Sequence, residues 1–250
     1  MNTTTRADYE EKGLHSLLPR KVVRVSETIV VKSGGNIPTH EGPTLRFIKQ
    51  NTTIPVPDVH DIRWKDGKVT ELVMDYMPET PLDQVWGSLN HDQKTSIADQ
   101  LYSYLAQRRE LKGTAIGCSE RGKALFGRDS MLEGGPFQSE MEFNEFILSN
   151  TLRIPDLLLH YAKYALFEGH NIIFTHGDIA PSNILVDGDQ VTAILDWEYA
   201  GWYPEHWEYS NALKVINPVP GWSDYLAIIL PPQYEKEYIG MFFLSRLLRH

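Results

Sequence analysis

The chain has 250 residues, with 24 Lys or Arg and 33 Asp or Glu, so its formal net charge is −9 at pH 7. This acidic balance argues against a general nucleic-acid binder, which needs a basic surface to displace counterions from phosphates. Hydrophobic residues make up 42% of the chain, which is typical of a globular protein. The chain has a single cysteine, Cys118, which excludes an intrachain disulfide and a thiolate metal cluster.

The N-terminal segment is polar and lacks the apolar core of a secretory signal. No apolar run reaches the roughly 18 residues that a membrane helix needs. Together with the single cysteine, these features predict a cytoplasmic protein without membrane contact. No feature of the sequence indicates an oligomeric state.

Strands dominate the first third of the chain. Residues 20–32 carry β-branched residues on both sides of Ser26 and Glu27, which predicts two short strands joined by a turn. The segment 33–43 has the composition of a loop. It leads into a short predicted helix at 44–50.

A second strand pair is expected over 59–64 and 69–74, with a turn at 65–67. Helical patterns follow the proline-containing segment 77–81, which is therefore the best candidate for a boundary between two parts of the chain. The early part is rich in predicted strands and the later part is rich in predicted helices.

Capping-box pairs predict helix starts after Asn90 and after Ser139, because Gln93 and Glu142 follow at the required spacing. Glycine is frequent over 113–138, which predicts a long surface loop. Further helices are expected over 156–168, 205–215 and 234–248.

Residues 171–196 have a different pattern, with short apolar runs separated by polar turns. The pattern predicts strands over 171–175, 184–187 and 190–195, with a loop over 176–183. The polar side chains lie in the loop and at the end of the last strand. This segment is the most informative part of the sequence.

Four residues of this segment have the types that phosphoryl transfer from ATP requires. Asp178 is placed to orient or deprotonate the attacking hydroxyl, and Asn183 and Asp196 offer oxygen ligands for magnesium. His176 is expected to brace the loop by hydrogen bonding rather than to transfer protons. The alternatives are that Asp178 and Asp196 are ordinary loop carboxylates and that Asn183 caps a turn.

The segments HGDIAPSNILVD (176–187) and AILDWEYAGWYPEHWEY (193–209) resemble the aminoglycoside phosphotransferase-like branch of the kinase superfamily. Protein kinases have His-Arg-Asp and Asp-Phe-Gly at the two positions, and no Ala-Pro-Glu segment follows here, so the small-molecule branch matches better. The run Trp-Tyr-Pro-Glu at 202–205 is similar to that of fungal-type members. The resemblance extends from about Lys21 to the C-terminal helix.

This resemblance implies a bilobal, protein-kinase-like α+β fold. Residues 1–77 are expected to form a small, β-rich, nucleotide-binding lobe, and residues 78–250 a larger, mainly helical lobe for catalysis and substrate. It also implies that Lys32 neutralises the nucleotide phosphates with Glu41 as its partner. The implied adenine contacts are backbone groups of 75–77, hence Asp75 and Met77.

The implied activity is MgATP-dependent transfer of the γ-phosphate to a hydroxyl of a small molecule, either aminoglycoside-like or another hydroxylated metabolite. One departure favours an alternative. The chain has no glycine between Leu14 and Ser33, so a glycine-rich phosphate loop is absent, and Glu27 adds negative charge where it would lie. The alternative is a kinase-fold protein that binds a ligand or partner, or performs other chemistry, in the same cleft.

Two further groups of residues are expected to be structural. The aromatic residues Trp197, Trp202, Tyr203 and Trp207 are interpreted as core packing, with a substrate wall as the alternative. The acidic residues Glu140, Glu142 and Glu145 are interpreted as a solvated helix face, with binding of a cationic amino-sugar as the alternative. Cys118 is expected to have no role in the chemistry.

Overall fold

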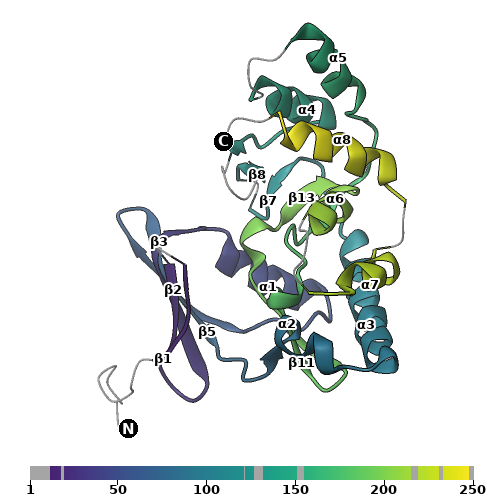
Figure 1. The fold of residues 1–250 in the computed structure, drawn as a ribbon. Helices are drawn as coiled ribbons and strands as arrows, with labels where there is room; N and C mark the ends of the chain where they lie inside the picture. Colours follow the sequence, from purple (N-terminus) through teal and green to yellow (C-terminus); the bar gives the residue numbers. More distant parts are fainter. Residues whose placement is uncertain are drawn as a thin grey trace.

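The structure is a computed structural model that describes residues 12–17, 20–120, 122–126, 132–150, 155–214, 219–230 and 233–247. The polypeptide forms a strand-rich N-terminal part and a larger, mainly helical C-terminal part (Figure 1). Among the described residues, no helix combines the length and the apolar character that crossing a bilayer requires. The predicted boundary after residue 77 stays a prediction, although the main sheet does end at Asp75.

The N-terminal part is a five-stranded antiparallel sheet in the order β1-β2-β3-β5-β4. Its strands are β1 (Lys12–Leu17), β2 (Arg20–Arg24), β3 (Ile29–Ile37), β4 (Val59–Lys65) and β5 (Lys68–Asp75). The four strands predicted in this region are confirmed. The loop predicted from residue 33 is wrong at its start, because β3 continues to Ile37 through an irregular register with β5.

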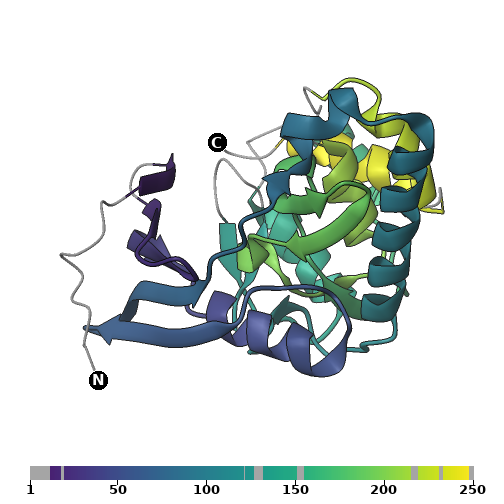
Figure 2. The same cartoon turned by 90° about the horizontal axis from the view of Figure 1, so that it is seen from below.

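One helix, α1 (Glu41–Asn51), connects β3 to β4 and lies beside the sheet in Figure 2. Its Leu45 and Ile48 are buried, as the predicted helical face requires. Because α1 begins at Glu41, the first carboxylate of the helix lies close to β3. This connection therefore fixes the positions of two predicted site residues.

The C-terminal part contains six α-helices longer than one turn among the described residues. They are α3 (His91–Arg109), α4 (Glu140–Ser149), α5 (Asp156–Tyr164), α6 (Trp207–Lys214), α7 (Trp222–Ile229) and α8 (Glu235–Ser245). The short α2 (Leu82–Val85) and the 3₁₀ turn η2 (Trp86–Ser88) precede them. Asn90 and Gln93 form the predicted capping box of α3, and Ser139 caps α4 by accepting a hydrogen bond from the Glu142 N–H.

Short strands of the C-terminal part carry the polar loop. The first group has the order β12-β11-β6, and the second has the order β10-β13-β7. Their bounds are β6 (Thr80–Pro81), β11 (Ile184–Asp187), β12 (Gln190–Ile194), β7 (Gly117–Cys118), β10 (Ile172–Thr175) and β13 (Gly201–Pro204). A separate hairpin pairs β8 (Ala124–Phe126) with β9 (Leu132–Gly134).

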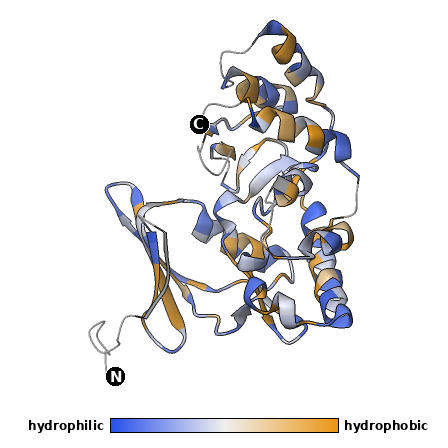
Figure 3. Cartoon of the chain, in the orientation of Figure 1, coloured by the Kyte–Doolittle hydropathy of each residue, from blue (hydrophilic) through white to orange (hydrophobic). Residues whose placement is uncertain are grey.

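Buried apolar residues form two clusters. The larger cluster joins α1, α3, α7 and the β11–β12 hairpin, and the smaller one lies among α4, α5, α6 and α8. Figure 3 shows α4 with both hydrophilic and hydrophobic residues, which is typical of a helix with one buried face. Helices α4, α5, α6 and α8 thus pack around an apolar cluster that is separate from the larger one.

Some predicted elements differ from the structure. The loop predicted over 113–138 contains β7, β8 and β9, and α5 ends at Tyr164 rather than at residue 168. β13 was not predicted because its Gly201 and Pro204 are unfavourable in strands. Gly201 is required there, since a Cβ at this position would overlap the Gly117 carbonyl.

Candidate active site

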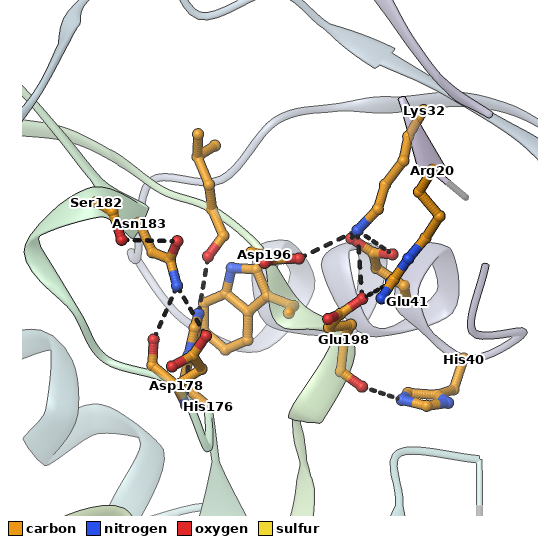
Figure 4. A network of polar contacts seen from close by, with 12 residues as sticks. Arg20, Lys32, His40, Glu41, His176, Asp178, Ser182, Asn183, Asp196 and Glu198 are labelled. Carbon is orange, nitrogen blue, oxygen red and sulfur yellow. Dashed lines mark hydrogen bonds and ion pairs between the residues drawn. The ribbon is translucent and has the colours of Figure 1, made fainter. Parts of the chain in front are cut away.

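The predicted phosphate lysine is at the centre of a buried ionic network (Figure 4). Lys32 Nζ, on β3, lies 2.8 and 2.9 Å from the two carboxylate oxygens of Glu41, at the start of α1. The same ammonium lies 3.1 Å from Asp196 Oδ1. The structure therefore brings together three of the predicted site residues, two from the β3–α1 segment and one that lies 164 residues from Lys32 in the chain.

Burial and charge have opposite effects on the ionisation of this network. Burial disfavours the Lys32 ammonium, but the surrounding carboxylates outweigh it and hold the pKa of Lys32 above its ordinary value. Burial raises the pKa of Glu41 to about 6 despite the ammonium. Burial also opposes ionisation of Asp196, yet Lys32 keeps its pKa below the ordinary value. The Asp196 side chain is 38% exposed, against 3% for Glu41, so Asp196 is the carboxylate that a ligand can reach.

Glu198 is a member of the network that the sequence interpretation missed. Its carboxylate forms an ion pair with Arg20 on β2 and lies 3.7 Å from Lys32 Nζ. Its backbone carbonyl lies 2.8 Å from His40 Nε2, just before α1. Glu198 lies within the segment 193–209 that carries the family resemblance, so the sequence could have indicated it as a site residue. No local pattern in the sequence indicates Arg20 or His40.

The loop that carries Asp178 is braced by a neutral histidine. The Asp178 N–H donates to His176 Nδ1 at 3.1 Å, so the ring proton is on Nε2, which lies 2.9 Å from the Leu195 carbonyl. Burial lowers the pKa of His176 to about 4, which keeps the ring uncharged near neutral pH. The predicted bracing role of His176 is confirmed by these contacts.

Asn183 holds Asp178 in place through its side-chain NH₂ group, while its side-chain oxygen points away from Asp178. Its Nδ2 donates to the Asp178 carbonyl at 3.0 Å and to Asp178 Oδ2 at 3.1 Å. Because both donor bonds go to Asp178, the amide oxygen lies on the opposite side, toward Ser182 (Figure 4). The Asn183 side chain therefore holds the predicted catalytic carboxylate and directs its own oxygen away from it, where Ser182 Oγ makes a long contact of 3.5 Å.

A buried carboxylate on α6 holds the start of the same loop. Glu208 accepts hydrogen bonds from the backbone N–H groups of His176 and Gly177, and from Arg108 on α3. Gly177 has a φ of +80°, and a Cβ there would lie 2.7 Å from the Tyr199 carbonyl. Glycine is thus required at this point of the loop. No role for Glu208 is predicted from the sequence, although the residue lies in the segment 193–209 that carries the family resemblance.

The two halves of the site are joined through Leu195. Its N–H donates to the Asn183 carbonyl at 2.8 Å, while its carbonyl accepts the His176 bond. The next residue, Asp196, has left-handed backbone angles of φ 62° and ψ 61°. Such angles are uncommon for a residue with a Cβ and are found most often where function or the surrounding fold imposes them. They turn the Asp196 carboxylate toward Lys32.

The predicted adenine contacts at 75–77 lie at the end of β5. The Asp75 N–H donates to the Asp58 carbonyl and the Tyr76 N–H donates to the Thr28 carbonyl. The Asp75 carboxylate also accepts from the Asp58 N–H. Within the described parts of the chain, no residue accepts from the Met77 N–H. The adenine contact stays a prediction, and Met77 is the residue with an N–H available for it.

The aromatic residues after Asp196 are mainly core residues, as interpreted. Trp197, Tyr203 and Trp207 are buried, and Tyr203 stacks on Trp207 with ring centroids 4.9 Å apart. Trp202 is partly buried and meets Phe174 edge to face. The alternative of a substrate wall is therefore wrong for the three buried rings.

The interpretation of the α4 acidic residues is wrong at one position. Glu142 and Glu145 are exposed, but Glu140 is buried. Its carboxylate bonds to His170 Nδ1 at 2.8 Å and lies 3.5 Å from His206 Nε2. The helical pattern could not reveal this burial, because both histidines come from other segments.

The sequence of the chain was compared with models of protein families. Residues 40–230, well over half of the chain, match the model of the phosphotransferase enzyme family. The chain belongs to this family. A comparison with curated proteins gave no match. The matched range contains Glu41, the 176–183 loop and Asp196, and it ends within the helical part.

Solved structures of aminoglycoside phosphotransferases have a similar fold. A GDP complex of a variant of aminoglycoside 2′-phosphotransferase-IIIa has a TM-score of 0.62 at 11% identity, over 95% of this chain and 82% of that one. The streptomycin–ATP complex of APH(2″)-IIa has a TM-score of 0.62 at 13% identity, over 93% and 81%. The structure of APH(4)-Ia has a TM-score of 0.58 at 15% identity, over 95% of this chain and 77% of that one. This family member thus has the predicted bilobal, protein-kinase-like α+β fold.

Proposed function

We propose that this member of the phosphotransferase family transfers the γ-phosphate of MgATP to a hydroxyl of a small molecule. The observation that carries the proposal is the position of Asp196. It bonds to Lys32 on the N-terminal sheet and follows Leu195, whose backbone is held by the loop of Asp178. Hydrogen bonds and ion pairs thus connect Lys32, the proposed metal ligand Asp196 and the proposed catalytic loop.

In this proposal, Lys32 and Glu41 act on the triphosphate. A phosphate entering the network offers Lys32 new anionic partners, and Glu41 holds the ammonium in place through two bonds. Residues 1–77 then serve as the nucleotide-binding lobe. The Met77 N–H supplies the adenine contact, since the N–H groups of the two residues before it already have partners.

Asn183 and Asp196 are the proposed magnesium ligands. Carboxylate and amide oxygens suit Mg²⁺, and the Asn183 oxygen, which has only a long contact with Ser182 in the described part of the chain, and the 38% exposed Asp196 carboxylate meet that requirement. Bound Mg²⁺ would neutralise charge on the phosphates during transfer. The chain's contribution is to hold both oxygen ligands through the bonds around Leu195.

Asp178 is the proposed catalytic residue. Its backbone is fixed by His176 and its carboxylate by Asn183, so one anionic group is held at the acceptor side of the loop. There it accepts the proton of the attacking hydroxyl or orients that hydroxyl. Residues 78–250 form the catalytic and substrate lobe. The acceptor class is a hydroxylated metabolite, including aminoglycosides such as the streptomycin named for one similar structure.

The experiment is an ATP-consumption screen over hydroxylated amines, sugars and natural products, run in parallel with Asp178→Asn as the inactive control. We expect acceptor-dependent ADP formation by the wild type alone. Thermal melting with and without MgATP tests nucleotide binding independently of the acceptor. No shift at millimolar MgATP, together with no turnover, would support the alternative of a kinase-fold protein without phosphotransfer activity.

A further inference from the structure

A second cluster of polar side chains lies outside the proposed active site, in the helical part of the chain. It consists of Glu140, the first residue of α4, His170, which precedes β10, and His206, which precedes α6. One ligand atom from each residue lies within 4.8 Å of the others. The proposed phosphotransfer uses none of these residues.

The spacing of the cluster suits a tetrahedral metal ion. Glu140 Oε1 lies 2.8 Å from His170 Nδ1 and 3.5 Å from His206 Nε2. Bonds of about 2.0–2.1 Å to zinc place neighbouring tetrahedral ligands roughly 3.4 Å apart. Small side-chain movements therefore suffice to admit an ion.

His206 lacks the hydrogen bonds that a buried imidazole needs. The residue is 7% exposed, and its Nδ1 has no hydrogen-bond partner among the described residues. Its Nε2 is 3.5 Å from Glu140 Oε1, beyond the range of an ordinary hydrogen bond. Burying an imidazole without hydrogen-bond partners costs free energy of folding. A metal bond at Nε2 would compensate part of that cost.

The outer contacts of the cluster are those of a metal site. The His170 N–H donates to Glu140 Oε2 at 3.0 Å, which leaves Oε1 directed at the two imidazoles. Glu237, in the first turn of α8, lies 3.5 Å from His170 Nε2. A carboxylate at the far nitrogen of a ligating histidine orients the ring and strengthens its metal bond.

We propose that Glu140 Oε1, His170 Nδ1 and His206 Nε2 bind one Zn²⁺ or a similar divalent transition metal. Two imidazoles and one carboxylate select such a metal over Mg²⁺, which prefers oxygen ligands. Water completes the coordination, and Glu237 is a positioning residue. The ion would connect the start of α4 to the segments that precede β10 and α6, beside the smaller core cluster, and would stabilise that part of the protein.

The simplest explanation without a metal is a hydrogen-bonded pair of Glu140 and His170, with His206 in a longer contact of 3.5 Å to the same carboxylate. That explanation leaves His206 Nδ1 without a partner among the described residues and predicts no stoichiometric binding of zinc. Mutation of His206 distinguishes the two, because the pair of Glu140 and His170 survives it. The exposed His160, on α5, provides a matched control for adventitious binding by a surface imidazole.

The test uses the full chain, stripped with a chelator and titrated with Zn²⁺ by calorimetry and thermal melting. We expect one ion per chain and a raised melting temperature, retained by His160→Asn and lost by His206→Asn. Glu237→Gln should weaken binding about 10–100-fold. The Co²⁺-substituted wild type should show visible d–d bands, and thiolate charge transfer should be absent because the buried Cys118 is not a ligand.

Absence of stoichiometric Zn²⁺ binding by the wild type would overturn the proposal. So would equal binding by the wild type and folded His206→Asn. A Co²⁺ thiolate band that disappears in Cys118→Ser would assign the ion to another place. If His206→Asn fails to fold, Glu237→Gln decides the question, because unchanged Zn²⁺ affinity in that folded variant would place the ion away from His170 and overturn the proposal.

Discussion

Lys32 Nζ and Asp196 Oδ1 are 3.1 Å apart, although 164 residues separate them in the chain. The lysine belongs to the N-terminal sheet, and the aspartate follows the β11–β12 hairpin of the C-terminal part. This bond is therefore a direct contact between the two parts at the proposed phosphate site. Three carboxylates surround the one ammonium, including Glu41 and Glu198.

Substitution of Lys32 by Met should abolish most of the phosphotransfer. The change removes the cation for the phosphates and leaves Glu41, Asp196 and Glu198 without their common partner. Loss of one such electrostatic contact costs about 10²–10³-fold in kcat. Steady-state kinetics with an acceptor from the screen measures the loss, and the exposed Lys65→Met, on β4, serves as a control for charge. Wild-type kcat in Lys32→Met would contradict the assigned role.

Asp178→Asn should separate chemistry from nucleotide binding. Because the amide keeps the size of the carboxylate but accepts no proton, we expect kcat to fall by about 10²–10⁴-fold. The thermal shift with MgATP should remain close to the wild-type value, since Lys32 and Asp196 are unchanged. Asp187→Asn, an exposed change at the end of β11, should retain full activity. Loss of the MgATP shift in Asp178→Asn, with turnover intact, would reverse the assignment.

Local sequence signals predicted the strands well where turn residues and alternating hydrophobic residues agree. The hairpins β4–β5 and β11–β12 are examples, since their tight turns contain Gly67 and Gly188, both with positive φ. β13 was missed because Gly201 and Pro204 are uncommon in strands. A tertiary contact, the approach of the Gly117 carbonyl, explains that glycine.

Long-range contacts limited the prediction of the site. The spacing of His176, Asp178, Asn183 and Asp196 is local, so the sequence was sufficient to select them. Arg20 reaches Glu198 across 178 residues, and no local pattern encodes such a pair. Glu140 was misinterpreted for the same reason, because its histidine partners lie 30 and more residues away.

Glu208→Ala should destabilise the protein strongly. Arg108 Nη1 donates to Glu208 Oε2 at 2.7 Å, and both side chains are buried. Removing one partner of a buried ion pair leaves an uncompensated charge and costs about 3–5 kcal/mol. Urea denaturation gives the free energy of unfolding, with the exposed Glu145→Ala as the control.

A double-mutant cycle with Arg108→Met extends this prediction. We expect the double variant to lose less stability than the sum of the two single losses, because no unpaired charge remains in it. The N–H groups of His176 and Gly177 still lose their acceptor, so stability should not return fully. Strictly additive losses would mean that Arg108 and Glu208 are not coupled.

His176 should make stability depend on pH between about 4 and 6.5. Its pKa is about 4 in the folded protein, against an ordinary value of 6.5, so within this range the unfolded chain binds a proton that the native ring does not. Stability therefore rises with pH through the range and is lost as the pH falls. The shift corresponds to roughly 3 kcal/mol for this buried ring.

Urea denaturation of the wild type and His176→Gln at pH 4.5, 5.5 and 7.5 isolates this contribution, because the other titrating groups are common to both proteins. The stability advantage of the wild type should be largest at pH 7.5 and should shrink by about 2–3 kcal/mol at pH 4.5, since the glutamine binds no proton. The exposed His160→Gln serves as a control for the loss of a surface imidazole. A constant difference between wild type and His176→Gln would mean that the ring takes up its proton over the same pH range in the folded and unfolded states. At pH 4.5 Nδ1 would then carry a proton and could not accept the Asp178 N–H.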